Sequence, residues 1–235
     1  MEKSTGMVGK AKENALFIVI PGKNEQKNIG KVIRKAKKYC QNVVVVDDGS
    51  TDRTATVAKN EGALVLRHVI NLGKGAALKT GCDYAIHEGA KRIIVMDADG
   101  QHDPKEIPRF VAALKNSDIV FGIRKFDRNM PNVMKIGNWF INKMTRELYD
   151  VGIKDTLCGY RAFTSSAYLK IRWNASDYSM ESEMVANVGR HKLKYKEINI
   201  DTIYNDKYKG TTIFDGMKIA MDLLYWKLRR NGFHR

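Results

Sequence analysis

The strongest chemical signal in the sequence is an acidic segment that directly follows a β-branched run and has the sequence DADGQHD at 97–103. Alternate residues that leave a strand point to the same side, so Asp97, Asp99 and Gln101 would present oxygen ligands to one divalent cation. Mg²⁺ and Mn²⁺ are commonly held by one or two carboxylates together with substrate phosphates. The alternative is an Asx-rich turn that caps the next helix. Because a cap needs only one carboxylate, we assign Asp103 to the cap and favour the metal for Asp97 and Asp99.

A second acidic turn, DDGSTD at 47–52, follows another apolar run. A carboxylate in such a place can accept hydrogen bonds from a ribose hydroxyl or a base N–H. The same residues can also form a tight turn, with Ser50 or Asp52 as the cap of a helix. Both interpretations can hold together, because Asp47 and Asp48 are left over once the cap is assigned.

The segment NLGKG at 71–75 predicts a turn that enters a helix. It lacks the GxxxxGK[ST] spacing of a P-loop, and no GxGxxG follows a strand, which argues against a Rossmann dehydrogenase. On its own the segment indicates only a turn, with Lys74 in reach of a phosphate.

The elements that must position these residues alternate through the first half of the chain. Apolar runs predict strands at 16–20, 43–47, 63–67, 92–97 and 118–122, and helical periodicity predicts helices at 28–39, 52–61, 75–88 and 104–115. This alternation indicates an α/β fold with an open, doubly wound, mostly parallel sheet flanked by helices. Ligands of such sheets bind beyond the carboxyl ends of the strands, which is where the polar segments and Arg124 fall.

The second half is less regular. We expect strands at 156–163 and 194–202, a helix at 178–190, and two amphipathic helices at 133–148 and 213–228. The apolar face of the last helix would carry Phe214, Met217, Met221, Leu224 and Leu228. The expected organisation is a basic tail at 1–14, one domain at 15–212 and a basic amphipathic C-terminal helix at 213–235. Such a helix can lie in a membrane interface or pack on the core.

Composition narrows the class of protein. The chain has 235 residues, and 41 Lys and Arg against 26 Asp and Glu leave a net charge of +15, which favours anionic partners. The three cysteines show no CxxC pair, so we expect buried free thiols in a reducing compartment. No apolar run is long enough for a signal peptide or a membrane span, so we expect a cytoplasmic protein, peripheral on the cytoplasmic face of a membrane.

The motifs taken in order are more specific than any one of them. PGKNE at 21–25, DDGSTD, NLGKG and DADGQHDP resemble glycosyltransferase family 2, whose members have the Rossmann-like GT-A fold. GIR at 122–124, PNVMKIGNWFINK at 131–143, DTLCGYRAF at 155–163 and SMESEM at 179–184 are similar to the polyprenyl-phosphate sugar synthases. This group comprises the dolichyl-phosphate mannose and dolichyl-phosphate glucose synthases. The resemblance covers about residues 15–212.

The resemblance implies inverting transfer of a hexose from a nucleotide-diphosphate sugar to polyprenyl (dolichyl) phosphate, which makes a lipid-linked sugar donor for glycan assembly. It assigns the nucleotide sugar to Pro21, Asn24, Glu25, Asp47, Asp48, Lys74, Asp97, Ala98 and Asp99. Mg²⁺ or Mn²⁺ is assigned to Asp97, Asp99 and Gln101. Catalytic roles are assigned to Asp99, Arg124, Glu181 and Glu183, and the acceptor phosphate is assigned to Arg124, Lys135 and Lys207. For Glu181 and Glu183 the open interpretations are orienting arginines or the sugar, or forming ordinary pairs on a helix surface.

A phosphate monoester is already anionic at neutral pH because its second pKa is about 6. Transfer to it needs no strong general base, whereas transfer to a sugar hydroxyl does. The residues of DADGQHDP and DTLCGYRAF are more similar to the dolichyl-phosphate glucose synthases than to the mannose synthases, which slightly favours a UDP-sugar over GDP-mannose. The alternatives are a family 2 enzyme that acts on a sugar hydroxyl or polysaccharide and, more distantly, a basic nucleic-acid-binding protein. No nucleic-acid-binding motif occurs, so we expect no nucleic-acid partner. A lipid acceptor favours membrane contact by at least one amphipathic helix.

Overall fold

A computed structural model describes residues 15–124, 132–201 and 213–231. Its seven strands form one sheet of order β3-β2-β1-β4-β6-β5-β7. They are β1 (Leu16–Gly22), β2 (Val43–Asp48), β3 (Leu64–His68), β4 (Arg92–Val95), β5 (Ile119–Arg124), β6 (Arg161–Thr164) and β7 (Tyr195–Ile200). All neighbours pair in parallel except β6, which is antiparallel to both β4 and β5. The expected open, mostly parallel sheet is confirmed.

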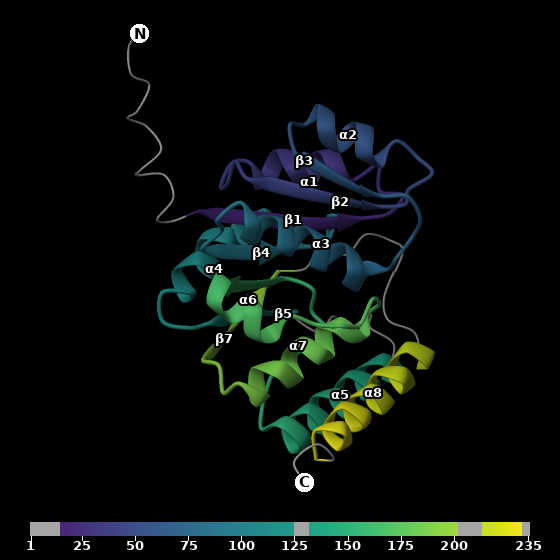
Figure 1. Cartoon of the computed structure of the whole chain (residues 1–235), viewed down its shortest axis with the longest axis vertical. Coiled ribbons are helices and arrows are strands. Elements are labelled where there is room, and N and C mark those ends of the chain that lie inside the picture. Colours follow the sequence, from purple (N-terminus) through teal and green to yellow (C-terminus); the bar gives the residue numbers. More distant parts are fainter. Residues whose placement is uncertain (1–14, 125–131, 202–212, 232–235) are drawn as a thin grey trace.

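Helices cover both faces of this sheet (Figure 1). They are α1 (Ile29–Ala36), α2 (Thr54–Asn60), α3 (Lys74–His87), α4 (Ile107–Ala113), α5 (Asn132–Tyr149), α6 (Ser165–Ile171), α7 (Ser179–Arg190) and α8 (Ile213–Asn231), with a 3₁₀ turn at Pro104–Glu106. The sequence analysis missed α6. It also expected a strand from residue 156, but β6 begins only at Arg161, because turns occupy the stretch before it.

The strands of the sheet bury two separate cores, one on each face. In β1, Ile18 and Ile20 belong to one core and Val19 to the other, and all three are fully buried. Burial on both faces is why the central strands, such as β1 and β5, are almost continuously apolar in sequence. The three cysteines are free and buried, as expected.

The order of the strands places the site. From β1 the chain winds outward through β2 to β3, and β4 then pairs on the other side of β1. The crevice at such a reversal is where open α/β sheets bind ligands. The acidic turns after β2 and β4 therefore both open onto it.

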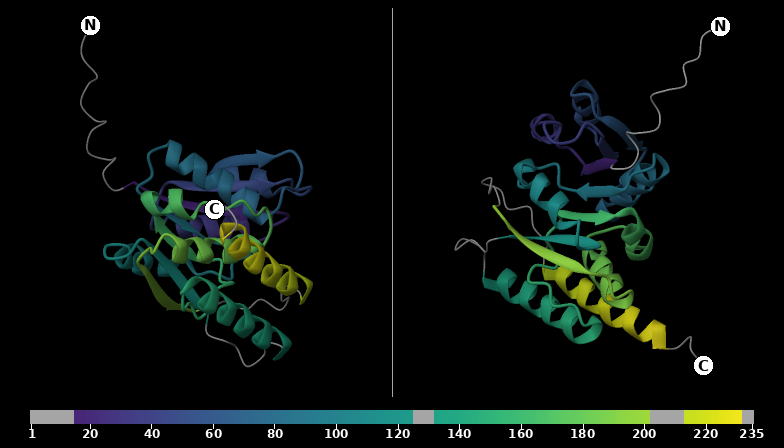
Figure 2. Two further views of the ribbon diagram at one scale, coloured as in Figure 1. Left: turned by 60° about the horizontal axis from the view of Figure 1, so that its bottom comes forward. Right: turned by 90° about the vertical axis from the view of Figure 1, so that its left-hand side faces the viewer.

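At the end of the molecule opposite α2, the long helices α5 and α8 lie side by side (Figures 1 and 2). In α8, the side that packs on the domain is not the apolar stripe that the sequence singled out. Its domain-facing side carries Ile219 and Leu223, which are fully buried. Its other side carries the described members of the apolar stripe that the sequence singled out, and these are exposed: Met217, Met221, Leu224 and Leu228. Helix α8 is thus apolar on two sides.

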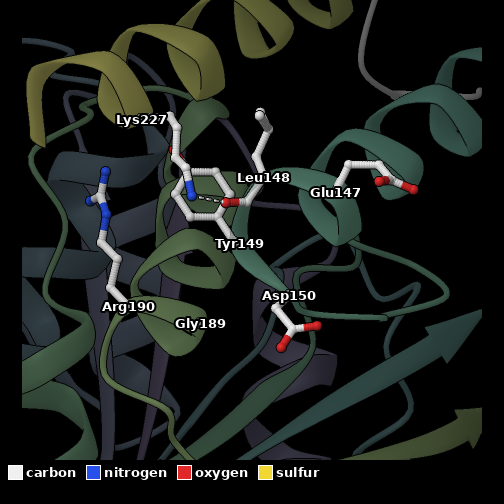
Figure 3. A pocket seen from close by; sticks show the side chains of 7 residues that line it. All are labelled: Glu147, Leu148, Tyr149, Asp150, Gly189, Arg190 and Lys227. Carbon is white, nitrogen blue, oxygen red and sulfur yellow. Dashed lines mark hydrogen bonds between the residues drawn. The ribbon is translucent and has the colours of Figure 1, made fainter. Parts of the chain in front are cut away.

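Side-chain hydrogen bonds fix α8 against α5 and α7. The Tyr149 hydroxyl donates to the carbonyl of Leu223 at 2.7 Å. The Lys227 ammonium donates to the carbonyl of Leu148 and lies over the Tyr149 ring, with the Arg190 guanidinium also against that ring. Figure 3 shows these groups around a pocket of about 250 Å³ that contains none of the candidate site residues. The pocket belongs to the joint that orients α8.

No helix in the described ranges is both long and apolar enough to cross a bilayer.

Candidate active site

The loops that follow β1 and β2 are bound together. The side-chain oxygen of Asn24 accepts from the Thr51 backbone N–H at 2.9 Å, and the Asn24 N–H donates to the Ser50 hydroxyl at 2.9 Å. Asn24 adopts a positive φ of 56°, a conformation that asparagine tolerates better than most residues. Pro21 is buried in β1, and the Glu25 carboxylate accepts from the Asn28 amide at 2.7 Å. Asp47 joins the same turn, because its carboxylate accepts from the Ser50 N–H at 3.2 Å. The predicted nucleotide-site residues Pro21, Asn24, Glu25 and Asp47 therefore lie at one edge of the sheet.

Asp48 has a structural task that the sequence analysis did not foresee. Its carboxylate accepts from the backbone N–H groups of Leu72 at 2.8 Å and Gly73 at 2.9 Å. It also lies 2.8 Å from the His68 ring. A buried carboxylate bonded in this way fixes the backbone of the loop. Asp48 thus holds the NLGKG segment where it enters α3.

Asp47 is completely buried, and Arg67 supplies its counter-charge. The Arg67 Nε lies 3.1 Å from Asp47 Oδ2, and its NH2 group donates to the carbonyl of Ser50 at 3.1 Å. Arg67 itself is largely exposed at the crevice. The sequence analysis missed this arginine, although its place at the end of a parallel strand was a usable signal.

Lys74 joins two distant parts of the chain. Its ammonium lies 2.8 Å from Asp97 Oδ1 and 3.0 Å from Glu181 Oε1. A Cβ on Gly159 would lie 2.9 Å from both the Lys74 ammonium and Asp97 Oδ2. The backbone of the DTLCGYRAF segment therefore packs directly on the ion pair, and a side chain at residue 159 would require Lys74 or Asp97 to shift.

The two carboxylates of the DADG segment differ electrostatically. Burial raises the pKa of Asp97, but nearby positive groups, Lys74 foremost and also Arg124, more than offset this, so that the pKa falls to about 2. Burial and the nearby charge of Asp97 raise the pKa of Asp99 above its usual value. Asp99 Oδ1 accepts from the Gln101 N–H at 2.9 Å, and the Ala98 side chain is buried in the core. Asp97 and Asp99 thus form a close pair of like charges.

His102 binds the backbone of this acidic pair. Its Nδ1 accepts from the Asp97 backbone N–H at 3.0 Å, and its ring stacks on Tyr160. Burial lowers the pKa of His102 to about 4, so the ring is neutral at physiological pH. As predicted, Asp103 caps the following turn by accepting from the Lys105 N–H at 3.1 Å.

These residues fit a divalent cation that is shared with a substrate. Two carboxylates with mutual repulsion are hard oxygen donors of the kind that Mg²⁺ and Mn²⁺ take. No cluster of three His, Cys, Asp or Glu side chains suited to a metal occurs in the described parts of the chain. The predicted ligand Gln101 lies in the same loop, and substrate phosphates and water, which are usual ligands of Mg²⁺, would complete the coordination.

Arg124 lies at the end of β5 and is oriented by Asp155. Its Nε and NH2 groups each lie 2.8 Å from a carboxylate oxygen of Asp155, which is fully buried. Arg124 also helps to lower the pKa of Asp97, so it contributes positive charge to the same crevice. Of the other acceptor-phosphate candidates, Lys207 lies outside the described residues. Lys135 is in α5, at a position whose side chain is likewise outside the description.

Arg161 is a buried cation with a different task. Its guanidinium donates to the carbonyls of Thr156 at 2.6 Å, Cys158 at 2.9 Å and Glu181 at 2.9 Å. It is 1% exposed, so it holds the DTLCGYRAF loop against α7 and does not face the crevice. No pattern in the sequence distinguished it from a substrate-facing arginine.

Glu181 and Glu183 are both buried, which rules out the interpretation that they form ordinary surface pairs. Glu181 accepts the Lys74 ammonium. The Glu183 carboxylate accepts from the backbone N–H groups of Asn174 at 2.9 Å and Ala175 at 2.8 Å. That loop packs against the first turn of α3, since the Trp173 indole donates to the carbonyl of Gly75 at 2.8 Å.

Comparison with known proteins identifies the family of the chain. The model of the glycosyl transferase family 2 matches residues 17–172. A UDP-N-acetylglucosamine–dolichyl-phosphate N-acetylglucosaminyltransferase of Methanococcus voltae is 31% identical, over 92% of this chain and 97% of its own. A polyprenol monophosphomannose synthase of Mycolicibacterium smegmatis is 33% identical, over 68% of this chain and 66% of its own.

Among solved structures, glucosyl-3-phosphoglycerate synthase from Mycobacterium tuberculosis, in complex with Mn²⁺, UDP and glucosyl-3-phosphoglycerate, superposes with a TM-score of 0.71 at 18% identity. The match covers 95% of this chain and 82% of that one. At this identity the likeness concerns the fold, which is GT-A in both. The chain is therefore a glycosyltransferase that belongs to family 2 and has the GT-A fold.

Proposed function

We propose that this enzyme transfers a sugar from a nucleotide-diphosphate sugar to a polyprenyl phosphate at a membrane surface, with a divalent cation and with inversion at the anomeric carbon. The observation that carries the proposal is the attachment of two helices with exposed apolar faces to the charged crevice. The relatives named for dolichyl and polyprenyl phosphate support the acceptor class.

Helix α5 links the apolar surface to the crevice. The Asn142 amide donates to the carbonyl of Lys154 at 2.6 Å and accepts from the Thr156 N–H at 3.1 Å, so it brackets Asp155, the partner of Arg124. On its outer side α5 exposes Ile136, Trp139 and Phe140. The helix that fixes the arginine's carboxylate thus also presents apolar side chains to the outside.

Helix α8 is attached in a similar way. The Ser179 hydroxyl, at the start of α7, donates to Asp222 at 2.7 Å, and Lys218 pairs with Asp177. The outer side of α8 exposes Met221 and Leu228 by 70% and 68%. Contiguous exposed apolar surface of this kind marks an interaction site. A helix with one apolar face open and basic residues nearby suits a lipid interface.

The charges in the crevice suit a phosphate acceptor. The nucleophile is already anionic, so the protein must bring two anions together and stabilise the departing diphosphate. Arg124 and Arg67 supply fixed positive charge for this. Glu181 and Glu183 are engaged with Lys74 and with backbone N–H groups, so neither is placed as a strong base. When bound, a divalent cation would act as a Lewis acid on the diphosphate, held by Asp97 and Asp99.

A UDP-sugar is the donor that we favour over GDP-mannose. The relative from Methanococcus voltae that matches over nearly the whole chain is named for UDP-N-acetylglucosamine, and the structural neighbour was crystallised with UDP. The buried free thiols are typical of a reducing compartment, so the proposal includes the cytoplasmic face of the membrane.

The direct test is turnover of a donor panel with a short polyprenyl phosphate. The panel contains UDP-glucose, UDP-N-acetylglucosamine and GDP-mannose, each with Mn²⁺, with Mg²⁺ and with a chelator. The proposal predicts metal-dependent release of UDP or GDP together with a glycolipid of inverted anomeric configuration. Transfer onto soluble saccharides, with none onto the lipid phosphate from any donor, would refute it.

A further inference from the structure

The position of Lys74 suggests a second task for it. The residue opens α3, yet its ammonium bridges a carboxylate after β4 and a carboxylate on α7 at 2.8 and 3.0 Å. Its side chain is 19% exposed, and the ring of Tyr178 lies 5.7 Å from the ammonium. A lysine that is enclosed between two carboxylates is a fixed counter-charge and not a mobile surface group.

The surroundings hold this ammonium in place. Asp48 fixes the backbone of Leu72 and Gly73, and a Cβ on Gly73 would lie 2.4 Å from the carbonyl oxygen of Ser176. The Gly159 backbone lies close to the ammonium, since a Cβ there would lie 2.9 Å from it. The backbone turn that enters the helix of Lys74 is therefore fixed, and the Lys74 ammonium lies against a separate backbone segment.

Asp97 is one of the two carboxylates that suit a divalent cation, so Lys74 and that cation would share the same carboxylate. We propose that Lys74 is a positioning residue that serves as the resident counter-cation of Asp97 in the substrate-free enzyme, so that tight metal binding requires the nucleotide diphosphate. The inference rests on the metal dependence in the proposed function. The physical reason is that a unit charge at about 3 Å opposes a second cation on the same carboxylate, whereas a diphosphate brings negative charge that offsets both.

The test is the affinity of the protein for Mn²⁺ alone, measured by electron paramagnetic resonance of the unbound ion. We expect weak binding by the wild type and tighter binding, by about tenfold, in the Lys74→Met variant. Lys74→Arg keeps the charge and should bind as weakly as the wild type. Lys79→Met, the same change on the same helix, is the matched control and should also leave the affinity unchanged. A merely structural role for Lys74 predicts the opposite, namely weaker metal binding in Lys74→Met.

A second pair of variants keeps the test valid if Lys74→Met does not fold, since that change leaves Glu181 buried without its ammonium. Glu181→Gln alone should bind Mn²⁺ no more tightly than the wild type. Lys74→Met combined with Glu181→Gln leaves no uncompensated charge at Glu181 and should bind Mn²⁺ about tenfold more tightly than Glu181→Gln alone. Equal or weaker binding in the double variant would overturn the inference.

Adding UDP or GDP separates this inference from the proposed function. The wild type should bind Mn²⁺ tightly once a nucleoside diphosphate is present. If it binds Mn²⁺ under neither condition, the metal dependence of the proposed function fails, and the inference fails with it. If it binds Mn²⁺ with the nucleotide but Lys74→Met gains nothing without it, only the inference fails.

Discussion

The crevice at the carboxyl edge of the sheet and the outer side of the α5–α8 pair follow opposite physical rules. In the crevice, carboxylates are largely buried and are held by short contacts to cations, as with Lys74 between Asp97 and Glu181. On the outer side, apolar groups such as Trp139 and Met221 are exposed. Both arrangements raise the free energy of the protein when nothing is bound. A buried charge is stable only with an opposite charge or hydrogen bonds, and a large exposed apolar surface is stable only when another apolar surface covers it.

Under the proposed function, the two regions would bind two kinds of ligand in one reaction. A nucleotide diphosphate is small and highly charged, so it needs preorganised charges. A lipid acceptor is anionic only at its head group, so its apolar chain needs a surface continuous with the membrane. Asn142 of α5 ties the two regions together through the loop that carries Asp155.

The largest expected effect comes from the crevice. Asp97→Asn removes a carboxylate that Lys74 and the proposed metal both use, and we expect transfer activity to fall roughly a hundred- to a thousandfold. Asp83→Asn is the control, since Asp83 is bound to Arg172 on the surface. Initial rates with the preferred donor would check this. Activity within a fewfold of the wild type in Asp97→Asn would break the assignment of the metal to this edge.

The second effect concerns the outer side. Met221→Glu combined with Leu228→Glu places charge on the exposed face of α8, and we expect binding to anionic vesicles to fall by roughly tenfold or more. Transfer activity on acceptor embedded in vesicles should fall in parallel, whereas activity on acceptor in detergent should remain at the wild-type level. Leu169→Glu on α6 changes an equally exposed leucine away from this face and should have no effect. Flotation unaffected by the double change would show that α8 is not the membrane surface.

A third effect lies between the two regions. Glu183→Gln weakens the hold on the loop at 174–175, and we expect a loss of about 1–3 kcal/mol in the free energy of unfolding, because a buried carboxylate with two N–H partners is replaced by a neutral amide. Urea unfolding would measure it. If Glu183 were instead a general base, the free energy of unfolding of Glu183→Gln would equal that of the wild type, and its maximal rate would be strongly reduced at every pH.

The smallest effect is a pH dependence of stability. Burial holds the pKa of His102 at about 4 in the folded state, below its value of about 6.5 in the unfolded chain. The unfolded chain therefore gains the proton first, and stability present above pH 6.5 is lost as the pH falls towards 4, by about 2–3 kcal/mol. His102→Gln keeps an acceptor for the Asp97 N–H and should flatten this part of the profile. Unfolding measured in chelator from pH 4 to 8 would check it, and an unchanged slope would contradict it.

The sequence predicted the first half of the fold well because each strand there is a continuous apolar run and each acidic motif ends one. It could not predict the bridge from Lys74 to Glu181, since the two residues are far apart in the chain and meet only through packing. It also could not decide whether the apolar stripe of α8 packs on the core or faces outward. That helix is apolar on two sides, and Ile219 and Leu223, which are buried, look no different in sequence from Met221 and Leu228, which are exposed. The role of Arg161 depended in the same way on tertiary contacts with α7.

The most direct measurement of the central claim is a comparison of two acceptors that differ only in the phosphate. The enzyme would be given one nucleotide sugar with a short polyprenyl phosphate or with the matching polyprenol, and the products would be identified by mass spectrometry. Because Arg67 and Arg124 supply cations for the phosphate and both Glu181 and Glu183 are engaged in other contacts, the account predicts a sugar phosphodiester from the phosphate and no product from the alcohol. Equal transfer to the alcohol or to a sugar hydroxyl would contradict it.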